Sequence, residues 1–508
     1  MRYGFVIDNR RCIGCHSCTV ACKTENRVPL GVNRTWVKYV EKGRFPHVRR
    51  VFQVTRCNHC QKPPCVKICP VGAMYQRHDG IVDFNSAWCI GCKACMQACP
   101  YDAIYVDPDR NTAAKCHLCG HRIEVGLEPA CAVVCPQRAI VAGDLDNPDS
   151  EAAQLVAREA VHVRKPEQGT GPKVYYIDAD ESTLVPTAAR HESFYMWSER
   201  NRQVHGGGAT YDPGSPFLQK DTLAAYDVAH DRPWDWQVPV YFWMKSVGSG
   251  LLVVPALGLA LGHMSLNPLR DVVLSTLALI FIAATVVLLV SDLSRKDRFL
   301  KVLTSAQWKS WLSKGAFFLV LYSALCAALL LGTITGHAIL CRFLLWLTVL
   351  TGVGVAGYTA FLFGQCEGRD LWQSPLLPVH LVVQAVLVSA AVLMFLPSSL
   401  GATPRSQFLA IVALSITLVL HLLMIAGEIA IPHSTDNAGY ATWLITRGPY
   451  KKLFWIGAVG LGGVVPLLLL FASSVSTFAA GLSGVLALGG LLAFEWCFVM
   501  AGQRPPNS

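Results

Sequence analysis

The chain has 508 residues, of which 52% are hydrophobic and 15% are charged, and its mean hydropathy is +0.37. This composition is too apolar and too sparsely charged for one soluble globular protein, so part of the chain is expected in lipid. The formal net charge of +10 does not predict nucleic-acid binding, because the basic residues of the N-terminal part are scattered among cysteines. Sixteen of the twenty cysteines precede residue 136, which sets the first segment apart.

Residues 1–150 form the first predicted domain, an α+β segment in which short apolar runs alternate with cysteine-rich loops. Its apolar core is small for its length, so bound metal is expected to supply part of its stability. Two groups of cysteines have the spacing CxxCxxCxxxC, and two others widen the middle gap to four and eleven residues. The four groups are Cys12, Cys15, Cys18 and Cys22; Cys57, Cys60, Cys65 and Cys69; Cys89, Cys92, Cys95 and Cys99; and Cys116, Cys119, Cys131 and Cys135.

This spacing predicts four [4Fe-4S] clusters, which together need sixteen thiolates. Three thiolates of each group cap one cluster, and the fourth reaches a neighbouring cluster, so the groups share ligands. Zinc is disfavoured, because zinc sites take CxxC pairs separated by a longer stretch and need no third cysteine two residues on. Disulfides are disfavoured because the spacing is too tight for unstrained pairing and Met1–Arg11 lacks the apolar core of a signal peptide.

Residues 151–235 are polar, contain the run Gly206–Gly208 and several prolines, and show little periodicity. They are predicted to be a linker or docking segment with one short helix at about 150–160.

Residues 236–508 are predicted to be an all-α membrane anchor, because the sequence there contains apolar stretches of bilayer-spanning length. An even number of crossings would place both ends of this region on one side of the membrane. The eight predicted spans are 239–262, 272–291, 315–334, 342–363, 376–396, 407–431, 453–472 and 477–502.

The loops on the side of the cysteine domain contain eleven Lys and Arg residues, against three on the far side. The positive-inside rule therefore predicts a multi-pass protein of the cell (inner) membrane with a cytoplasmic cysteine domain. Two alternatives stay open: the basic loop after residue 291 is a docking surface for that domain, or the domain is periplasmic through co-export with a catalytic partner.

The strings CNHCQKPPCVKICP, CIGCKACMQACP and CHLC...CAVVCP resemble the four-cluster ferredoxin subunit of molybdopterin oxidoreductases such as dimethyl sulfoxide and polysulfide reductases. The resemblance covers residues 1 to about 150 and implies an α+β double-ferredoxin domain. Lys23 is a departure, since the other groups have proline at this position. The ligand sets that the resemblance implies are Cys12, Cys15, Cys18 with Cys135; Cys116, Cys119, Cys131 with Cys22; Cys57, Cys60, Cys65 with Cys99; and Cys89, Cys92, Cys95 with Cys69.

The second half resembles the eight-helix, quinone-reacting membrane anchors of the polysulfide-reductase type. The strings that carry this resemblance are SDLSRKDRF at 291–299, GYTAFLFG at 357–364, SPLLP at 374–378, GE at 427–428 and MAGQ at 500–503. In such relatives the ferredoxin and the anchor are commonly separate chains, whereas here they are fused, which fixes their stoichiometry.

Polar residues cluster at the ends of the predicted spans that face the cysteine domain, where a quinone headgroup would need hydrogen-bond donors and a proton route. The resemblance assigns a quinone-pocket tyrosine to Tyr358. Further candidates for the quinone site and its proton path are Tyr241, Lys245, His380 and Glu428.

Each candidate also has a structural interpretation. Tyr241 would serve as an aromatic-belt anchor and Lys245 would snorkel to the membrane surface. Asp292, another polar residue at this end, is expected to pair with Arg295 or Arg298 in the loop. Glu495 is left without an assignment, and Glu428 shares a helix face with His421, which suits either a proton path or an interhelical hydrogen bond. Haem is disfavoured because His380 and His421 are expected at different depths.

These features predict an electron-transfer and membrane-anchor subunit. It would relay electrons between menaquinone or ubiquinone and a separate catalytic subunit, which the resemblance identifies as a bis-molybdopterin guanine dinucleotide enzyme. One alternative is a module of a proton-coupled quinone oxidoreductase similar to alternative complex III. Another is a subunit of a hydrogenase or nitrite reductase complex.

Overall fold

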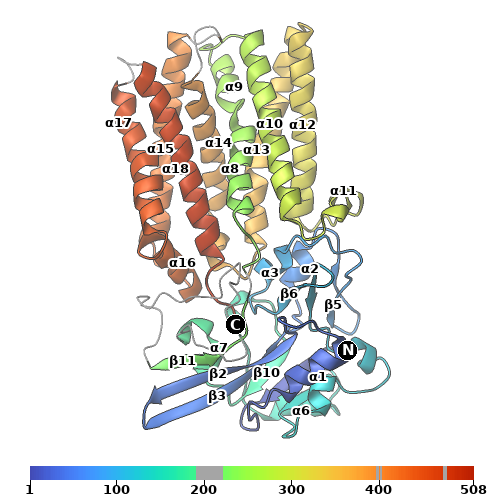
Figure 1. Cartoon of the computed structure of the whole chain (residues 1–508). Helices are drawn as coiled ribbons and strands as arrows, with labels where there is room; N and C mark the ends of the chain where they lie inside the picture. The colour runs from blue at the N-terminus through green and yellow to red at the C-terminus, as the bar shows by residue number, and fades with distance from the viewer. Residues whose placement is uncertain (190–220, 231, 396–399, 401–402, 473–476) are drawn as a thin grey trace.

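The computed structural model describes residues 1–189, 221–230, 232–395, 400, 403–472 and 477–508. They form an N-terminal domain of short strands and helices and a bundle of long helices, which lie end to end (Figure 1). In this view α2 (Pro64–Ile68) and α3 (Ala94–Ala98) lie at the side of the N-terminal domain that faces the bundle. Helix α1 (Ser17–Asn26) lies at the opposite side, far from the bundle.

A four-stranded sheet with the strand order β8-β1-β10-β9 forms one layer of the N-terminal domain. Strand β1 (Tyr3–Asp8) pairs antiparallel with β8 (Ile140–Asp144) and parallel with β10 (Val174–Ile177), and β10 pairs with β9 (Val161–His162). Helix α6 (Glu151–Arg158) covers this sheet through the fully buried Ala152. The short helix expected near residues 150–160 is therefore present.

A second sheet has the order β11-β2-β3 and is built on a long hairpin. It consists of β2 (Thr35–Arg44), β3 (His47–Arg56) and β11 (Thr222–Tyr226). The remaining strands form two short hairpins, β4 (Met74–Gln76) with β5 (Val82–Phe84) and β6 (Ile104–Asp107) with β7 (Thr112–Lys115). The other short helices of this domain are α4 (Gly120–Ile123), α5 (Ala130–Val133), η1 (Pro166–Gln168), α7 (Glu181–Leu184) and η2 (Pro186–Ala188).

The segment 151–235, expected as a linker or docking segment, supplies strands to both sheets in its described part. Strand β10 lies inside the first sheet because Val174, Tyr176 and Ile177 form a short apolar run that is buried there. The folded N-terminal unit therefore extends beyond residue 150. The Gly206–Gly208 run lies outside the described residues.

The bundle contains a helix at each of the eight predicted apolar stretches. Among the described residues, seven of these helices are long and apolar enough to cross a membrane, and the one at the fifth stretch is a shorter apolar helix. Smaller helices join them, namely η3 (Lys296–Arg298), α11 (Lys301–Thr304), η4 (Asp370–Gln373) and α16 (Asp436–Thr446). The helices at the eight stretches are α8 (Gln237–Gly250) with α9 (Val253–Ala260), α10 (Pro268–Asp292), α12 (Trp311–Ile334), α13 (Ala338–Gly364), the shorter α14 (Leu377–Leu393), α15 (Pro404–Ala430), η6 (Leu453–Val464) with α17 (Val465–Ala472), and α18 (Thr477–Gly502).

The first of these helices is broken between α8 and α9. Pro255 has no N–H group, so the carbonyl of Leu251 lacks its usual helical donor. Ser389 of α14 fills this gap: its Oγ donates to the Leu251 carbonyl at 3.2 Å and accepts from the Val254 N–H at 3.0 Å. A break inside the bundle is thus tolerated because a neighbouring helix pairs the freed backbone groups.

Candidate functional site

The four CxxC turns share one backbone conformation. The residue before the second cysteine has a positive φ in each turn: 70° at Gly14, 43° at His59, 69° at Gly91 and 58° at Leu118. Glycine adopts this conformation freely, whereas His59 and Leu118 are held in it at a steric cost. In three of these turns both cysteines line the same cavity. The local backbone therefore directs pairs of sulfur atoms toward one centre.

The structure brings together the same four sets of cysteines that the resemblance implies. Three cavities are each lined by one complete set. In the remaining set, Cys60 and Cys65 both interact electrostatically with Cys57 and Cys99. We define set 1 as Cys12, Cys15, Cys18 and Cys135; set 2 as Cys22, Cys116, Cys119 and Cys131; set 3 as Cys57, Cys60, Cys65 and Cys99; and set 4 as Cys69, Cys89, Cys92 and Cys95.

The chemistry of these sets fits iron–sulfur clusters. All twenty cysteines are free thiols, so none is committed to a disulfide. Burial raises the pKa of Cys60 to about 12, and a thiol in such a place gives up its proton when a metal ion takes the proton's position. Backbone N–H groups already point at sulfur atoms: Ala73 donates to Cys69 Sγ and Ala139 to Cys135 Sγ, each at 3.2 Å. Such bonds stabilise thiolate ligands and influence cluster potentials.

The sets follow one another through the domain from its outer surface inward. Set 1 contains Cys15, which is exposed, and Cys18 interacts electrostatically with Cys131 of set 2. Cys116 of set 2 interacts in the same way with Cys57 of set 3. Consecutive sets are therefore direct neighbours on this side of the domain.

The series continues to the bundle. Cys65 of set 3 interacts with Cys95 of set 4. Cys92 of set 4 interacts with Asp292 at the end of α10, and Cys366 after α13 interacts with Cys92. The four sets thus connect the exposed face around Cys15 with the ends of the long helices.

Set 4 is fastened to the bundle by an ion pair. Lys93 Nζ, next to Cys92 in the chain, lies 3.0 Å from Asp292 Oδ1. The expected pairing of Asp292 with Arg295 or Arg298 is therefore wrong, because Arg295 instead donates to Asp297 at 3.0 Å. The end of α10 faces the N-terminal domain, so its carboxylate meets a cation of that domain.

The basic loop after α10 also docks on the N-terminal domain. Arg298 Nη1 donates to the carbonyls of Ser86 at 2.8 Å and Cys89 at 3.0 Å. Lys301 Nζ donates to the carbonyl of Ala87 at 3.0 Å. The basic residues Arg298 and Lys301 therefore form a docking surface for the N-terminal domain, which was one of the alternatives for this loop.

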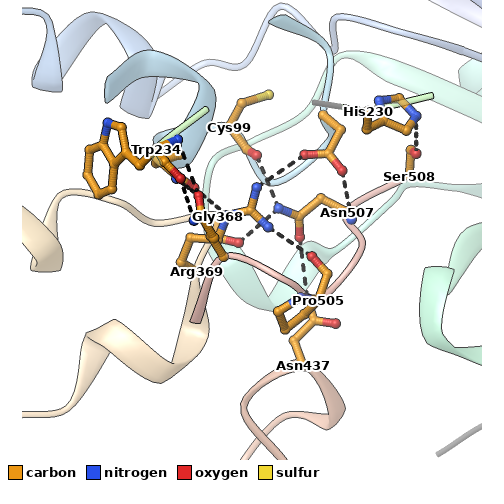
Figure 2. A network of polar contacts seen from close by, with 12 residues as sticks. Cys99, His230, Trp234, Gly368, Arg369, Asn437, Pro505, Asn507 and Ser508 are labelled. Carbon is orange, nitrogen blue, oxygen red and sulfur yellow. Dashed lines mark hydrogen bonds and ion pairs between the residues drawn. The ribbon is translucent and has the colours of Figure 1, made fainter. Parts of the chain in front are cut away.

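A polar network around Arg369 fastens the two parts at a second place (Figure 2). The Arg369 guanidinium is 5% exposed, and it donates to Gln97 Oε1 at 2.7 Å and to the Pro505 carbonyl at 2.8 Å. It also lies 3.7 Å from Asp102 Oδ1, whose other carboxylate oxygen accepts from the Asn507 N–H at 2.9 Å. The segment after α18 is thus enclosed between the domain and the bundle.

The polar residues expected to form one quinone site fall into two groups. In the first group Lys245 is fully buried, and its Nζ donates to the Ala356 carbonyl at 2.9 Å and to Thr359 Oγ1 at 2.7 Å. The ring of Tyr358 lies 5.3 Å from this Nζ, and Tyr241 is 4% exposed. Lys245 therefore does not snorkel and Tyr241 is not a belt residue, because both side chains point into the bundle.

The second group lines a cavity between α14, α15, α16, η6 and α18. His380 and Glu428 contribute to its wall, and Ser374 Oγ donates to Glu428 Oε2 at 2.9 Å. His380 Nε2 and His421 Nδ1 are 2.7 Å apart, so the expectation that the two histidines lie at different depths is wrong. Their rings are joined by a direct hydrogen bond. Most other lining residues are apolar or aromatic.

An unbroken row of aromatic side chains connects set 4 with this cavity. Trp234 Nε1 donates to the carbonyl of Cys92 at 3.4 Å. Successive ring centroids are then 5.4 Å apart for Trp234 and Trp372, 4.7 Å for Trp372 and Phe363, 6.2 Å for Phe363 and Phe498, 6.0 Å for Phe498 and Phe494, and 5.2 Å for Phe494 and His380.

The sequence was compared with models of known protein families, and three of them match. Residues 226–506, more than half of the chain, match the family described as polysulphide reductase, NrfD. The chain belongs to this family. Residues 48–145 and 11–74 each match a 4Fe-4S dicluster domain. The predicted fusion of a ferredoxin-type domain with a polysulfide-reductase-type anchor is thus confirmed.

Curated relatives match about a third of the chain. A tetrathionate reductase subunit of Salmonella typhimurium is 45% identical over 202 residues, which are 39% of this chain and 80% of the relative. A putative iron-sulfur subunit of dimethyl sulfoxide reductase from Halobacterium salinarum is 40% identical over 36% of this chain and 82% of its own length. The arsenate respiratory reductase iron-sulfur subunit ArrB of a Shewanella species is 37% identical over 35% of this chain and 96% of its own length. The predicted electron-transfer role of this family member agrees with these relatives.

Several residues that hold the site together carry no sequence signal. Arg369 and Lys93 bind partners that are distant in the chain, so no local sequence pattern predicts these contacts. The same is true of Arg56, whose Nη1 donates to Cys131 Sγ at 3.0 Å. One signal was available for His380 and His421, since both are rare polar residues in apolar spans.

Proposed function

We propose that this chain transfers electrons between membrane menaquinone or ubiquinone and a separate catalytic subunit, through four [4Fe-4S] clusters held by sets 1 to 4. The observation that carries the proposal is the uninterrupted series of four cysteine sets from exposed Cys15 to Asp292 at the bundle. The clusters supply one-electron transfer. The protein's part is to space them, exclude water and hold the quinone at the end of the series.

We place the quinone headgroup in the cavity at His380 and Glu428. An apolar cavity with a few polar groups suits a hydrophobic ring that carries two carbonyl oxygens. His380 and Glu428 offer groups that can exchange the two protons of a quinol, and the aromatic row leads from this cavity to Cys92. The alternative headgroup position is at Tyr358, the tyrosine that the resemblance implies, beside the further candidates Lys245 and Tyr241. It is supported by the interaction of Tyr241 with Asp292.

Conservative substitutions distinguish between the two proposed positions of the quinone headgroup. In the purified full chain, His380→Gln or Glu428→Gln should slow cluster reduction by a quinol at least tenfold, whereas Tyr358→Phe should change it little. Reduction by dithionite should be unaffected in all three variants, which controls for damaged clusters. The opposite ranking would place the headgroup at Tyr358.

The catalytic partner is proposed to dock around Cys15. Three apolar side chains near set 1 are exposed: Ile13 on the first CxxC turn (55%), Val20 on α1 (61%) and Val133 on α5 (59%), the short helix that precedes Cys135. Such a patch beside the outermost cluster suits a large protein partner that receives or supplies electrons. We propose a bis-molybdopterin guanine dinucleotide enzyme, by analogy with the reductases whose subunits match this chain.

The chain is a multi-pass membrane protein, and we propose that α14 is an eighth crossing and that the N-terminal domain is cytoplasmic. Four of the eleven basic residues on the near side contact the N-terminal domain, namely Arg295, Arg298, Lys301 and Arg369. The seven that remain still outnumber the three basic residues of the far-side loops, so the positive-inside rule gives the same orientation. Gly336 lies in the far loop between α12 and α13. A Gly336→Cys variant should gain a label over the wild-type chain from a membrane-impermeant maleimide in intact cells after outer-membrane permeabilisation, whereas no gain over the wild-type chain would support a periplasmic N-terminal domain.

A second candidate function, coupling of electron flow to proton movement, is favoured by one observation. Glu495 is fully buried in the bundle, with Oε1 accepting from Ser246 Oγ at 3.3 Å and Oε2 without a partner among the described residues. It interacts electrostatically with Lys245. Buried ionisable groups of this kind are typical of proton relays. In liposomes, oxidation of each quinol by the complex would then change the number of protons in the lumen by more than the number that the quinol itself releases.

A further inference from the structure

Arg56 is a fully buried cation without a carboxylate partner. It ends strand β3, and its side chain is 1% exposed. Among the described residues no Asp or Glu forms an ion pair with it. Burying an unpaired guanidinium is strongly unfavourable, so a negative charge that compensates for it is expected nearby.

The neighbours of Arg56 that can carry this charge are cysteine sulfurs of two different sets. Nη1 donates to Cys131 Sγ of set 2 at 3.0 Å. The guanidinium also interacts electrostatically with Cys116 of set 2 and with Cys18 of set 1. Arg56 therefore lies between the first two cluster positions of the series.

Two of its donor groups are unused. Nε and Nη2 are buried and have no hydrogen-bond partner among the described residues. Arg56 also lines the cavity of set 2, and its Cζ lies 4.3 Å from the centre of the Phe5 ring, which fixes the plane of the guanidinium. An anionic cluster with sulfide corners in this cavity would provide the acceptors that these donors lack.

We propose that Arg56 sets the reduction potentials of the clusters in sets 1 and 2, as a shared positive charge between them. A cluster gains one negative charge when it accepts an electron, and a fixed cation nearby stabilises that reduced form. Arg56 is at hydrogen-bond distance from set 2 and interacts electrostatically with Cys18 of set 1. Arg56 thus keeps the two clusters nearest the catalytic partner reducible. The inference rests on the proposed function, since it requires clusters in these sets.

The test is an anaerobic redox titration of the purified full chain, followed by electron paramagnetic resonance. Arg56→Gln and Arg56→Met remove the charge, Arg56→Lys keeps it, and Arg49→Gln is the control. Arg49 lies on the same strand, but its side chain is 70% exposed and pairs with Asp180. Iron content and cluster spectra are measured on every sample.

In the neutral variants two of the four midpoint potentials should fall by at least the equivalent of a tenfold loss in the equilibrium constant for reduction, about 59 mV for one electron. Arg56→Lys should recover more than half of this shift, and Arg49→Gln should show none. Unchanged potentials at full iron content would overturn the proposal. Loss of iron from both neutral variants would also overturn it, since Arg56 would then have a folding role. A wild-type chain without iron would instead refute the proposed function.

Discussion

Replacing Arg369 with methionine tests how the N-terminal domain is held on the helical bundle. The substitution removes two short hydrogen bonds from a buried guanidinium, to Gln97 and to the Pro505 carbonyl, and the nearby charge that faces Asp102. Hydrogen bonds of charged groups contribute about 1.5–3 kcal/mol each, so opening of this contact should become easier by about 3–6 kcal/mol. At about 1.4 kcal/mol per factor of ten, this corresponds to roughly 10² to 10⁴ in the opening equilibrium.

Hydrogen exchange of the intact chain in detergent measures this opening. Peptides that cover residues 97–102 and 505–508 should exchange at least about a hundredfold faster in Arg369→Met, because Asn507 N–H bonds to Asp102 in the same network. Arg342→Met is the matched control, since Arg342 is exposed near the opposite end of α13. Equal exchange in Arg369→Met and wild type would refute the role given to this network.

Three further predictions concern the clusters, the broken helix and the partner surface. Cys12→Ser and Cys135→Ser should abolish the same cluster signal and leave iron for about three clusters, whereas loss of different signals would contradict set 1. Ser389→Ala should destabilise the bundle by about 1–2 kcal/mol, because it leaves the Leu251 carbonyl and the Val254 N–H unpaired, and the thermal midpoint in detergent should fall. Ser323→Ala is the control, since it loses only a bond to Leu319 of its own helix and should lower the midpoint less. Equal effects of the two substitutions would refute the argument. Val20→Lys should weaken co-purification of the catalytic subunit at least tenfold, and Val48→Lys, at a similarly exposed site on β3, should not; parallel losses would exclude the Cys15 face as the specific docking site.

The cysteine pattern and the apolar stretches predict most of the architecture, because both are local signals. CxxC spacing dictates the turns at Gly14 and Gly91, and long apolar runs dictate helices such as α10 and α15. The division of the cysteines into four sets was implied by a family resemblance, and three cavities each bring together one complete set.

The parts that could not be predicted depend on contacts between distant segments. Strand β10 follows a long polar stretch, and only its place beside β1 shows that it belongs to the N-terminal domain. The grouping of His380 with His421, apart from Lys245 and Tyr358, depends on how the helices pack around α18. Helix periodicity alone does not determine such packing.

The central claim is that electrons pass, within one chain, between a membrane quinol and the four clusters that the cysteine sets are proposed to hold. The most direct measurement is the visible absorbance of the purified, anaerobic chain after addition of a menaquinol analogue. We predict that the cluster absorption bleaches on mixing and returns when excess oxidised quinone is added. Clusters that are reduced by dithionite but show no response to any quinol would contradict the claim.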